Sequence, residues 1–226
     1  MGAEAVLRDP AAAARPPRLA DIDALTLDAN GTLVYLVDPV PSLVAALATR
    51  GVERSPKQVA AAVEAEFDYY REHLVEGRDD ASLERLRQES AAVFLTAAAA
   101  DLDTAEFAPT YTGALRFELL PGVAAALERA AALGLELAVV SNWDVGLHEH
   151  LDRLQLTHRF RAIVTAAEAG ARKPDPAIFA IALEALGVRP ERTLHVGDGA
   201  TDREGALAAG LHFAPAPFDD ALAALA

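Results

Sequence analysis

The chain has 226 residues, 52% of them hydrophobic, which is enough to bury the core of one domain together with a subdomain. Its net charge of −14 argues against a nucleic acid or an anionic membrane as partner, because such surfaces are bound by lysine and arginine. The absence of cysteine excludes disulfides, thiolate zinc sites and cysteine nucleophiles. An anionic substrate must therefore meet a local positive charge or a metal ion.

The first twenty residues lack the uninterrupted apolar core of a signal peptide, since charged residues and prolines are scattered through them. No apolar run elsewhere reaches the length needed to span a membrane. We therefore expect residues 1–20 to be a disordered leader on a cytoplasmic protein without a membrane partner. The sequence gives no indication of the oligomeric state.

The stretch from Leu25 to Leu33 is an apolar run that delivers one carboxylate, Asp28, and then breaks at Gly31. Such a run predicts a buried strand, which would place Asp28 at the carboxyl end where open α/β sheets build their sites. An ionised carboxylate attacks phosphorus or carbon directly, so Asp28 is the candidate nucleophile. Gly31 allows a tight turn, and the Thr32 hydroxyl is suited to holding the carboxylate in line. The competing interpretation is structural, because aspartate often precedes a turn.

The block that follows the first strand, residues 39–119, is predicted to be entirely helical. Ser55 and Pro56 have the pattern of a helix cap followed by proline in the first position, and apolar residues then recur at helical spacing. Further helices are predicted from Pro41, over Asp80 to Ala100 and over Thr104 to Leu119, with no strand between Pro41 and Leu119. Because this block is inserted directly after the first strand, it would form a cap above Asp28.

From residue 120 onward, short apolar runs alternate with helical patterns closed by glycine. Strands are predicted at residues 135–140, 160–165, 193–196 and 211–214, and helices at residues 122–133, 145–154, 176–186 and 202–209. This alternation is typical of a parallel sheet with right-handed crossovers. The expected fold class is therefore α/β, a doubly wound, Rossmann-like parallel sheet from residues 21–38 and 120–226 with an inserted all-helical cap.

Polar residues follow two more of these segments. Ser141 and Asn142 come directly after a strand, where a hydroxyl and an amide could bind a substrate oxygen; they would serve equally well as a helix N-cap. Lys173 is one of only two lysines in a chain that otherwise uses arginine. A compact ammonium there suggests a point charge beside a carboxylate or phosphate, although a solvated loop residue is the alternative.

A second acidic cluster follows the strand near residue 196. Asp198 at this strand end and Asp28 at the first can jointly hold Mg²⁺, which takes hard oxygen ligands such as carboxylates. The ion would remove the repulsion between the two carboxylates and shield a phosphate from the anionic nucleophile. The competing interpretation is that Asp198 and Asp202 cap the next helix. His195 is expected to be a core residue with satisfied hydrogen bonds.

Together these motifs, Asp-x-x-Gly-Thr, Ser-Asn, Lys-Pro and Gly-Asp-x-x-x-Asp in that order, resemble the haloacid dehalogenase-like hydrolase superfamily, subfamily I with a helical C1-type cap. The resemblance implies an aspartyl-phosphate on Asp28, phosphate binding by Ser141 and Asn142 and charge neutralisation by Lys173. It also implies Asp198 as a Mg²⁺ ligand, beside Asp28 and the main-chain carbonyl of Asn30, with Asp202 as an auxiliary acid.

The sequence departs from the phosphatase pattern at Asn30. Phosphatases of this superfamily usually carry aspartate there, as the general acid that protonates the leaving oxygen and the base that activates water. An amide does neither, and such assistance is worth about 10²- to 10⁴-fold in rate. Acyl phosphates and anhydrides would suffer least, because their leaving groups depart without protonation.

Three functions remain open at this point. The first is a Mg²⁺-dependent phosphatase or phosphotransferase acting on a small phosphorylated metabolite. The second is a 2-haloacid dehalogenase in which Asp28 attacks carbon; those enzymes also lack the second aspartate, but do not need an acid such as Asp198. The third is a non-catalytic binding protein on the same fold.

Overall fold

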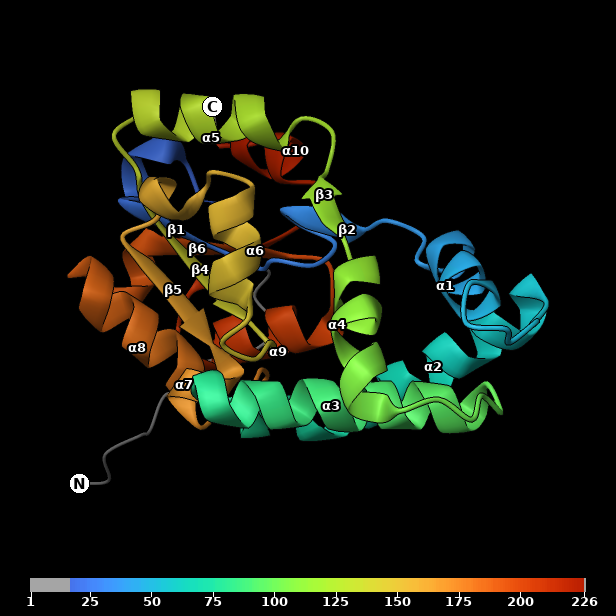
Figure 1. Cartoon of the computed structure of the whole chain (residues 1–226). Coiled ribbons are helices and arrows are strands. Elements are labelled where there is room, and N and C mark those ends of the chain that lie inside the picture. The colour runs from blue at the N-terminus through green and yellow to red at the C-terminus, as the bar shows by residue number, and fades with distance from the viewer. Residues whose placement is uncertain (1–16, 226) are drawn as a thin grey trace, which may run out of the picture.

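The computed structural model describes residues 17–225, and its centre is a five-stranded parallel sheet (Figure 1). The strands run in the order β5-β4-β1-β6-β7, so the strand order reverses beside β1. Their bounds are β1 Ala24–Leu27, β4 Glu136–Ser141, β5 Ala162–Thr165, β6 Thr193–Gly197 and β7 His212–Pro215. The predicted doubly wound α/β fold is confirmed.

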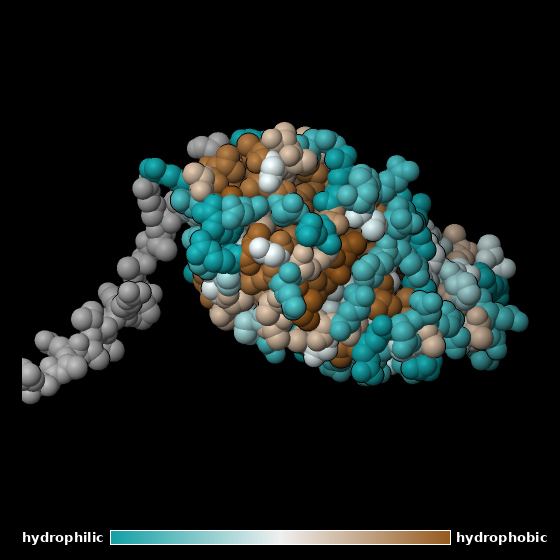
Figure 2. Space-filling view, turned by 90° about the vertical axis from the view of Figure 1, so that its left-hand side faces the viewer, coloured by the Kyte–Doolittle hydropathy of each residue, from teal (hydrophilic) through white to brown (hydrophobic). Residues whose placement is uncertain are grey.

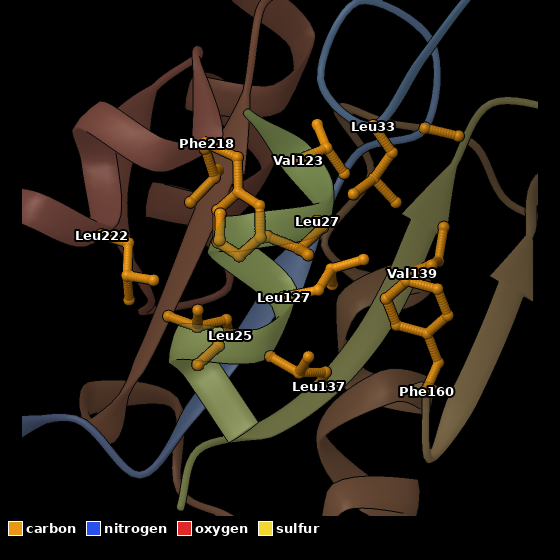
Figure 3. Packing of buried hydrophobic residues seen from close by; sticks show 14 of the residues in the cluster. Leu25, Leu27, Leu33, Val123, Leu127, Leu137, Val139, Phe160, Phe218 and Leu222 are labelled. Atoms are coloured by element: carbon orange, nitrogen blue, oxygen red, sulfur yellow. The ribbon is translucent and has the colours of Figure 1, made fainter. Parts of the chain in front are cut away.

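Helices cover both faces of this sheet because alternate strand residues point to opposite sides. Leu25 and Leu27 pack on the face covered by α5 (Val123–Ala132), α6 (Leu147–Arg153) and α10 (Phe218–Ala223). Figure 3 shows Leu127 of α5 lying against Leu25 and Leu27. The opposite face packs against α8 (Ala177–Leu186), with α7 (Ala166–Ala169) and α9 (Ala200–Ala208) beside it.

The helical insertion has an apolar core of its own, which includes Phe94, Phe107 and Tyr111. It consists of α1 (Val40–Ala48), α2 (Pro56–His73), the short helix η2 (Leu74–Glu76), α3 (Asp80–Ala97) and α4 (Thr104–Ala114). The α2 N-terminus has the predicted cap, since the Ser55 side chain accepts a hydrogen bond from the Gln58 amide. In Figure 1 these helices lie to one side of the sheet and beneath it.

The two chain connections between the insertion and the sheet form an antiparallel ribbon, β2 (Val34–Leu36) with β3 (Phe117–Leu119). The predicted helix from Thr104 to Leu119 is therefore wrong beyond Ala114, and a strand does lie in the block predicted to contain none. Helix α4 ends because Leu115 leaves the helical region, with φ −81° and ψ 80°. Strand β3 then finds its backbone partners in β2, a tertiary pairing that outweighs local spacing.

The described part of the expected leader is ordered rather than disordered. Residues Leu19–Asp21 form a short 3₁₀ helix, and the Leu19 amide donates a hydrogen bond to the Leu225 carbonyl at 2.9 Å. The remainder of the predicted leader, residues 1–16, lies outside the described residues. Helix α9 also begins two residues earlier than the predicted segment 202–209.

None of the helices in the described part of the chain combines the length and apolarity needed to cross a membrane. The face seen in Figure 2 carries apolar areas interrupted by hydrophilic side chains.

Candidate active site

Asp28 directly follows β1, at the point where the strand order of the sheet reverses. Ligands of open α/β sheets bind at such a position, outside the carboxyl ends of the strands. The Asp28 amide donates a hydrogen bond to the Val196 carbonyl at 2.9 Å, which continues the pairing of β1 with β6. The side chain is buried, so its position is fixed by the sheet rather than by a mobile loop.

One oxygen of the Asp28 carboxylate is held by two donors from other segments. Oδ1 accepts hydrogen bonds from Ser141 Oγ at 3.0 Å and from Lys173 Nζ at 2.5 Å. Among the described residues, no side chain hydrogen-bonds to Oδ2. The carboxylate is therefore oriented through one oxygen while the other remains available to a substrate or a cation.

Lys173 joins three groups of the site through the three hydrogens of its ammonium. Nζ donates to Asp28 Oδ1, to Asp202 Oδ1 at 2.6 Å and to the Val140 carbonyl at 2.9 Å. The residue is only 3% exposed, so the alternative of a solvated loop lysine does not describe it. Its charge is placed to offset that of the carboxylates, as the motif pattern implies.

Asn142 lies beside the site, but its amide is used on the backbone. Its Nδ2 donates to the Lys173 carbonyl at 3.0 Å, and its Oδ1 accepts from the Lys173 amide at 2.7 Å. This two-point contact fixes the loop that carries the Lys173 ammonium. Neither Ser141 nor Asn142 is a helix N-cap, since α6 has Gly146 in that position.

Asp198 follows β6 and faces the turn after Asp28. Gly31 has φ +82°, and a Cβ built on it would lie 2.0 Å from Asp198 Oδ2. Glycine is therefore required there both for the backbone conformation and for the approach of this carboxylate. One ligand atom from each of Asp28, Asp198 and Asp202 lies within 4.8 Å of the others.

Asp202 serves both the helix and the charge network. Its Oδ2 accepts a hydrogen bond from the Gly199 amide at 3.0 Å at the start of α9, and its Oδ1 lies 3.0 Å from His195 Nε2. Burial alone would raise the pKa of Asp202, but the hydrogen bond to His195 and the charge and hydrogen bond of Lys173 outweigh it. They hold the pKa well below its usual value, so Asp202 is an anion.

His195 is fully buried beneath the site, and its Nδ1 lies 2.9 Å from Thr26 Oγ1. Both ring nitrogens have partners, which confirms the prediction of a satisfied core histidine. Its contact with Asp202 was not predicted. Burial lowers the pKa of His195, so the imidazole is neutral near pH 7.

The donor set fits a divalent cation. Burial, and then the neighbouring charges of Asp28 and Asp202, raise the pKa of Asp198, and the Lys173 ammonium only partly offsets them. Three carboxylates and the single ammonium of Lys173 leave an excess of negative charge. Hard oxygen ligands in this arrangement suit Mg²⁺. The expectation that the Thr32 hydroxyl holds the Asp28 carboxylate is wrong, because the buried Thr32 Oγ1 has no hydrogen-bond partner among the described residues.

A cleft of about 510 Å³ lies between the site and the helical insertion. Asn30 is exposed there and shares the lining with Asn142 and Trp143 from the sheet side. Arg71 of α2 and Arg172, which directly precedes Lys173, also line the cleft. Arg172 Nη1 donates a hydrogen bond to the Arg71 carbonyl at 2.9 Å. The Arg172 contact was not predicted, because nothing in the sequence indicates which helix faces that loop.

Residues 22–210 match the family model of the haloacid dehalogenase-like hydrolases. The chain belongs to this family of enzymes. The residues that carried the resemblance, Asp28, Ser141, Lys173 and Asp198, all lie at the carboxyl edge of the sheet or in the loops above it.

Curated relatives of this haloacid dehalogenase-like hydrolase include proteins named as phosphatases. It is 39% identical over 111 residues to haloacid dehalogenase-like hydrolase domain-containing protein 3 of Bos taurus, covering 47% of this chain and 44% of that one. It is 40% identical over 98 residues to a phosphoserine phosphatase of Thermus thermophilus, covering 42% of this chain and 39% of that one. Each alignment spans less than half of the relative's own length.

Solved structures with the same fold include both chemistries of the family. L-2-haloacid dehalogenase of Xanthobacter autotrophicus has a TM-score of 0.61 and 26% identity, over 86% of this chain and 77% of that one. A phosphatase of Thermococcus onnurineus has a TM-score of 0.54 over 85% of each chain, and at 22% identity this likeness concerns the fold alone.

Proposed function

We propose that the protein is a Mg²⁺-dependent phosphatase or phosphotransferase that acts on a small phosphorylated metabolite through an aspartyl-phosphate on Asp28. The observation that carries the proposal is the convergence of Asp28, Ser141, Lys173 and Asp198 from four separate segments on one sheet edge. Phosphatase names among the relatives support the same reaction class.

In this mechanism, the Asp28 carboxylate attacks phosphorus, the bond between phosphorus and the leaving oxygen breaks, and the aspartyl-phosphate forms. Ser141 and Lys173 hold Oδ1 and thereby fix the angle of attack, an arrangement that lowers the entropic part of the barrier. The Lys173 ammonium also offsets negative charge where an anionic nucleophile meets an anionic phosphoryl group. Asn142 acts indirectly, since its amide positions the backbone of Lys173.

The cation would be held by Asp28, Asp198 and the main-chain carbonyl of Asn30, with Asp202 behind them. When bound, it supplies charge neutralisation for the transferring phosphoryl group. The raised pKa of Asp198 supports this assignment, because a cation would relieve the repulsion that causes it. Ser141 donates its one hydroxyl hydrogen to Asp28 Oδ1, so Thr32, whose Oγ1 has no partner among the described residues, is the hydroxyl that we assign to the substrate.

Asn30 limits the chemistry that this site performs well. Its amide cannot protonate an alkoxide leaving group or take a proton from the attacking water, so we expect acyl phosphates and anhydrides to react faster than alkyl esters. The same deficit slows hydrolysis of the aspartyl-phosphate, because no base at this position takes a proton from the attacking water.

A 2-haloacid dehalogenase is the second candidate, favoured by Asn30 and by the similarity in fold to the dehalogenase of Xanthobacter autotrophicus. Attack of Asp28 on carbon would need the same orientation by Ser141 and Lys173. That reaction would not use Asp198. The close approach of the Asp198 carboxylate to Gly31, in the turn after Asp28, therefore argues against a dehalogenase. A non-catalytic binding role is opposed by the orientation of the buried Asp28, which Ser141 and Lys173 hold through Oδ1 while Oδ2 has no side-chain partner among the described residues.

A substrate panel separates the three functions. We expect phosphate release from acetyl phosphate, and more slowly from p-nitrophenyl phosphate, in the presence of Mg²⁺ and not of EDTA. Halide release from 2-chloropropionate that is insensitive to EDTA would establish the dehalogenase instead. If none of these compounds is turned over, the non-catalytic binding role is the function that remains.

A further inference from the structure

A second cavity lies between the helical insertion and the sheet domain, and residues of both line it, among them Glu66, Tyr111 and Trp143. It has a volume of about 100 Å³, room for several waters or for a small organic group. Phe67, Tyr70, Phe117 and Trp143 line both this chamber and the cleft beside Asn30, so the two cavities adjoin. A substrate whose phosphate lies at Asp28 would extend toward this chamber.

The chamber walls are largely aromatic. Phe117 and Trp143 meet edge to face with ring centroids 4.8 Å apart, and the His150 ring lies 4.8 Å from Phe117. Burial lowers the pKa of His150 to about 4, so its ring is neutral near pH 7. Aromatic faces in such a group attract organic cations through their negative quadrupole.

Two buried carboxyl groups face the same space. Glu66 of α2 is 2% exposed and its Oε2 accepts a hydrogen bond from Tyr111 OH at 2.5 Å. Asp144 is 6% exposed, and its Oδ1 accepts from the Gly146 amide at 2.7 Å. Buried acids without a cation are rare in folded proteins unless they are neutral or serve a ligand.

The cations near the chamber offset these carboxyl groups only in part, because the charge of Arg87 lowers the pKa of Asp144 and that of Arg71 lowers the pKa of Glu66, but burial outweighs both. Arg87 of α3 lines the chamber, but its Nη2 is paired with Glu149 of α6 at 2.9 Å. Arg71 lies farther along α2, where it is exposed and paired with Asp68. The balance of charge around the chamber is therefore negative, on aromatic walls.

We propose that this chamber binds an organic ammonium group, so that among phosphate monoesters the site prefers those of amino alcohols. The inference rests on the proposed function, because it assigns the chamber to the leaving group of the phosphate ester. Glu66 and Asp144 supply the negative charge, and Phe117 and Trp143 supply the aromatic faces. Because Asn30 cannot act as a general acid, all alkyl esters react slowly. Their relative rates then depend on how well the chamber binds each leaving group.

The pH dependence of the preference has a defined sign. Burial raises the pKa of Asp144 to about 6 and raises that of Glu66, and a bound cation favours the ionised form of both. Binding of an ammonium group should therefore tighten as the pH rises through about 6. His150 is already neutral in this range, so it does not reverse the sign.

Charged esters compared with neutral isosteres test the proposal on the unchanged protein. The two pairs are phosphocholine with 3,3-dimethylbutyl phosphate, and ethanolamine phosphate with propyl phosphate. In at least one pair, we expect the charged ester to have the higher kcat/KM by about tenfold. Glu66→Gln keeps a hydrogen-bond acceptor for Tyr111 and should remove most of this preference. Glu64→Gln, an exposed change on the same helix, is the control of equal charge and should leave the preference intact.

A binding measurement separates failure of this proposal from failure of the proposed function. Choline or ethanolammonium chloride should raise the Tm above that in sodium chloride of equal ionic strength, whereas 3,3-dimethylbutanol should not, and Glu66→Gln should abolish the shift. If neither acetyl phosphate nor any ester releases phosphate, the proposed function fails and the Tm shift alone decides the chamber's role. Equal kcat/KM for both charged and neutral pairs, or no cation-specific Tm shift, would overturn the inference.

Discussion

Replacing Lys173 by methionine removes the ammonium that bridges Asp28 and Asp202 but keeps an unbranched side chain of similar length. The three residues are buried, and the two ion pairs have N···O distances of 2.5 and 2.6 Å. The change therefore leaves two carboxylates facing each other with no counter-charge.

The expected cost follows from these distances. Removing one partner of a buried ion pair costs about 3–5 kcal/mol, because the remaining charge stays desolvated. Two carboxylates about 4 Å apart repel by about 4 kcal/mol at an effective dielectric constant of 20, which is of the same size. We expect Lys173→Met to lower the free energy of unfolding by about 3–5 kcal/mol near pH 8.

The deficit should shrink in acid. Because the folded pKa of Asp202 is depressed, its contribution to stability is present above the unfolded pKa near 3.8 and is lost as the pH falls through the folded value. Without Lys173 that contribution is smaller at neutral pH, and protonation of the carboxylates relieves their repulsion. Mg²⁺ should restore part of the lost stability near pH 8 by the same reasoning.

Urea denaturation at pH 8 and pH 4, with and without Mg²⁺, measures these differences. Lys57→Met is the matched control, since Lys57 is the other lysine and is exposed at the start of α2. We expect it to change the free energy of unfolding by less than about 0.5 kcal/mol. The reasoning is refuted if Lys173→Met is no more destabilising than Lys57→Met.

Three further predictions concern the phosphate end of the site. Asn30→Asp should raise turnover of p-nitrophenyl phosphate by up to about 10²-fold and that of acetyl phosphate much less; equal effects would contradict a missing acid. Gly31→Ala should weaken Mg²⁺ activation more than tenfold, because its Cβ would meet Asp198 Oδ2 at 2.0 Å. Gly51 has a similar φ of +76°, but a Cβ there would have no atom within 4 Å, so Gly51→Ala is the control and should not weaken Mg²⁺ activation. The Mg²⁺ concentration for half-maximal turnover should rise as the pH falls toward 5, because the pKa of Asp198 is raised and a proton then competes with Mg²⁺ for its carboxylate. If this concentration does not change with pH, Asp198 is not a Mg²⁺ ligand.

The sequence predicts the site well where the polar residue directly follows a strand. Asp28, Ser141 and Asp198 converge because the carboxyl ends of parallel strands meet at one edge, which follows from the fold class alone. Asn142 shows the limit of this reasoning. Its position was predicted, but the orientation of its amide depends on the path of the Lys173 loop, which no periodicity describes.

Features that depend on contacts between distant segments were missed. Strand β3 is three residues long, and only its pairing with β2 distinguishes it from the end of a helix. Glu66 follows the helical pattern of α2 as a charged residue expected at the surface, and its partner Tyr111 lies 45 positions away. The residues around Glu66 in the sequence therefore do not indicate that its carboxyl group is buried.

The most direct test of the central claim is to look for a phosphoryl group on Asp28. The protein is incubated with acetyl phosphate and Mg²⁺, quenched in acid and mapped by peptide mass spectrometry. We predict an acid-stable, base-labile acyl phosphate on Asp28, long-lived because Asn30 cannot activate water, and absent in Asp28→Asn and in EDTA. Phosphate release that continues in Asp28→Asn, or a phosphoryl group found on another residue, would contradict the account.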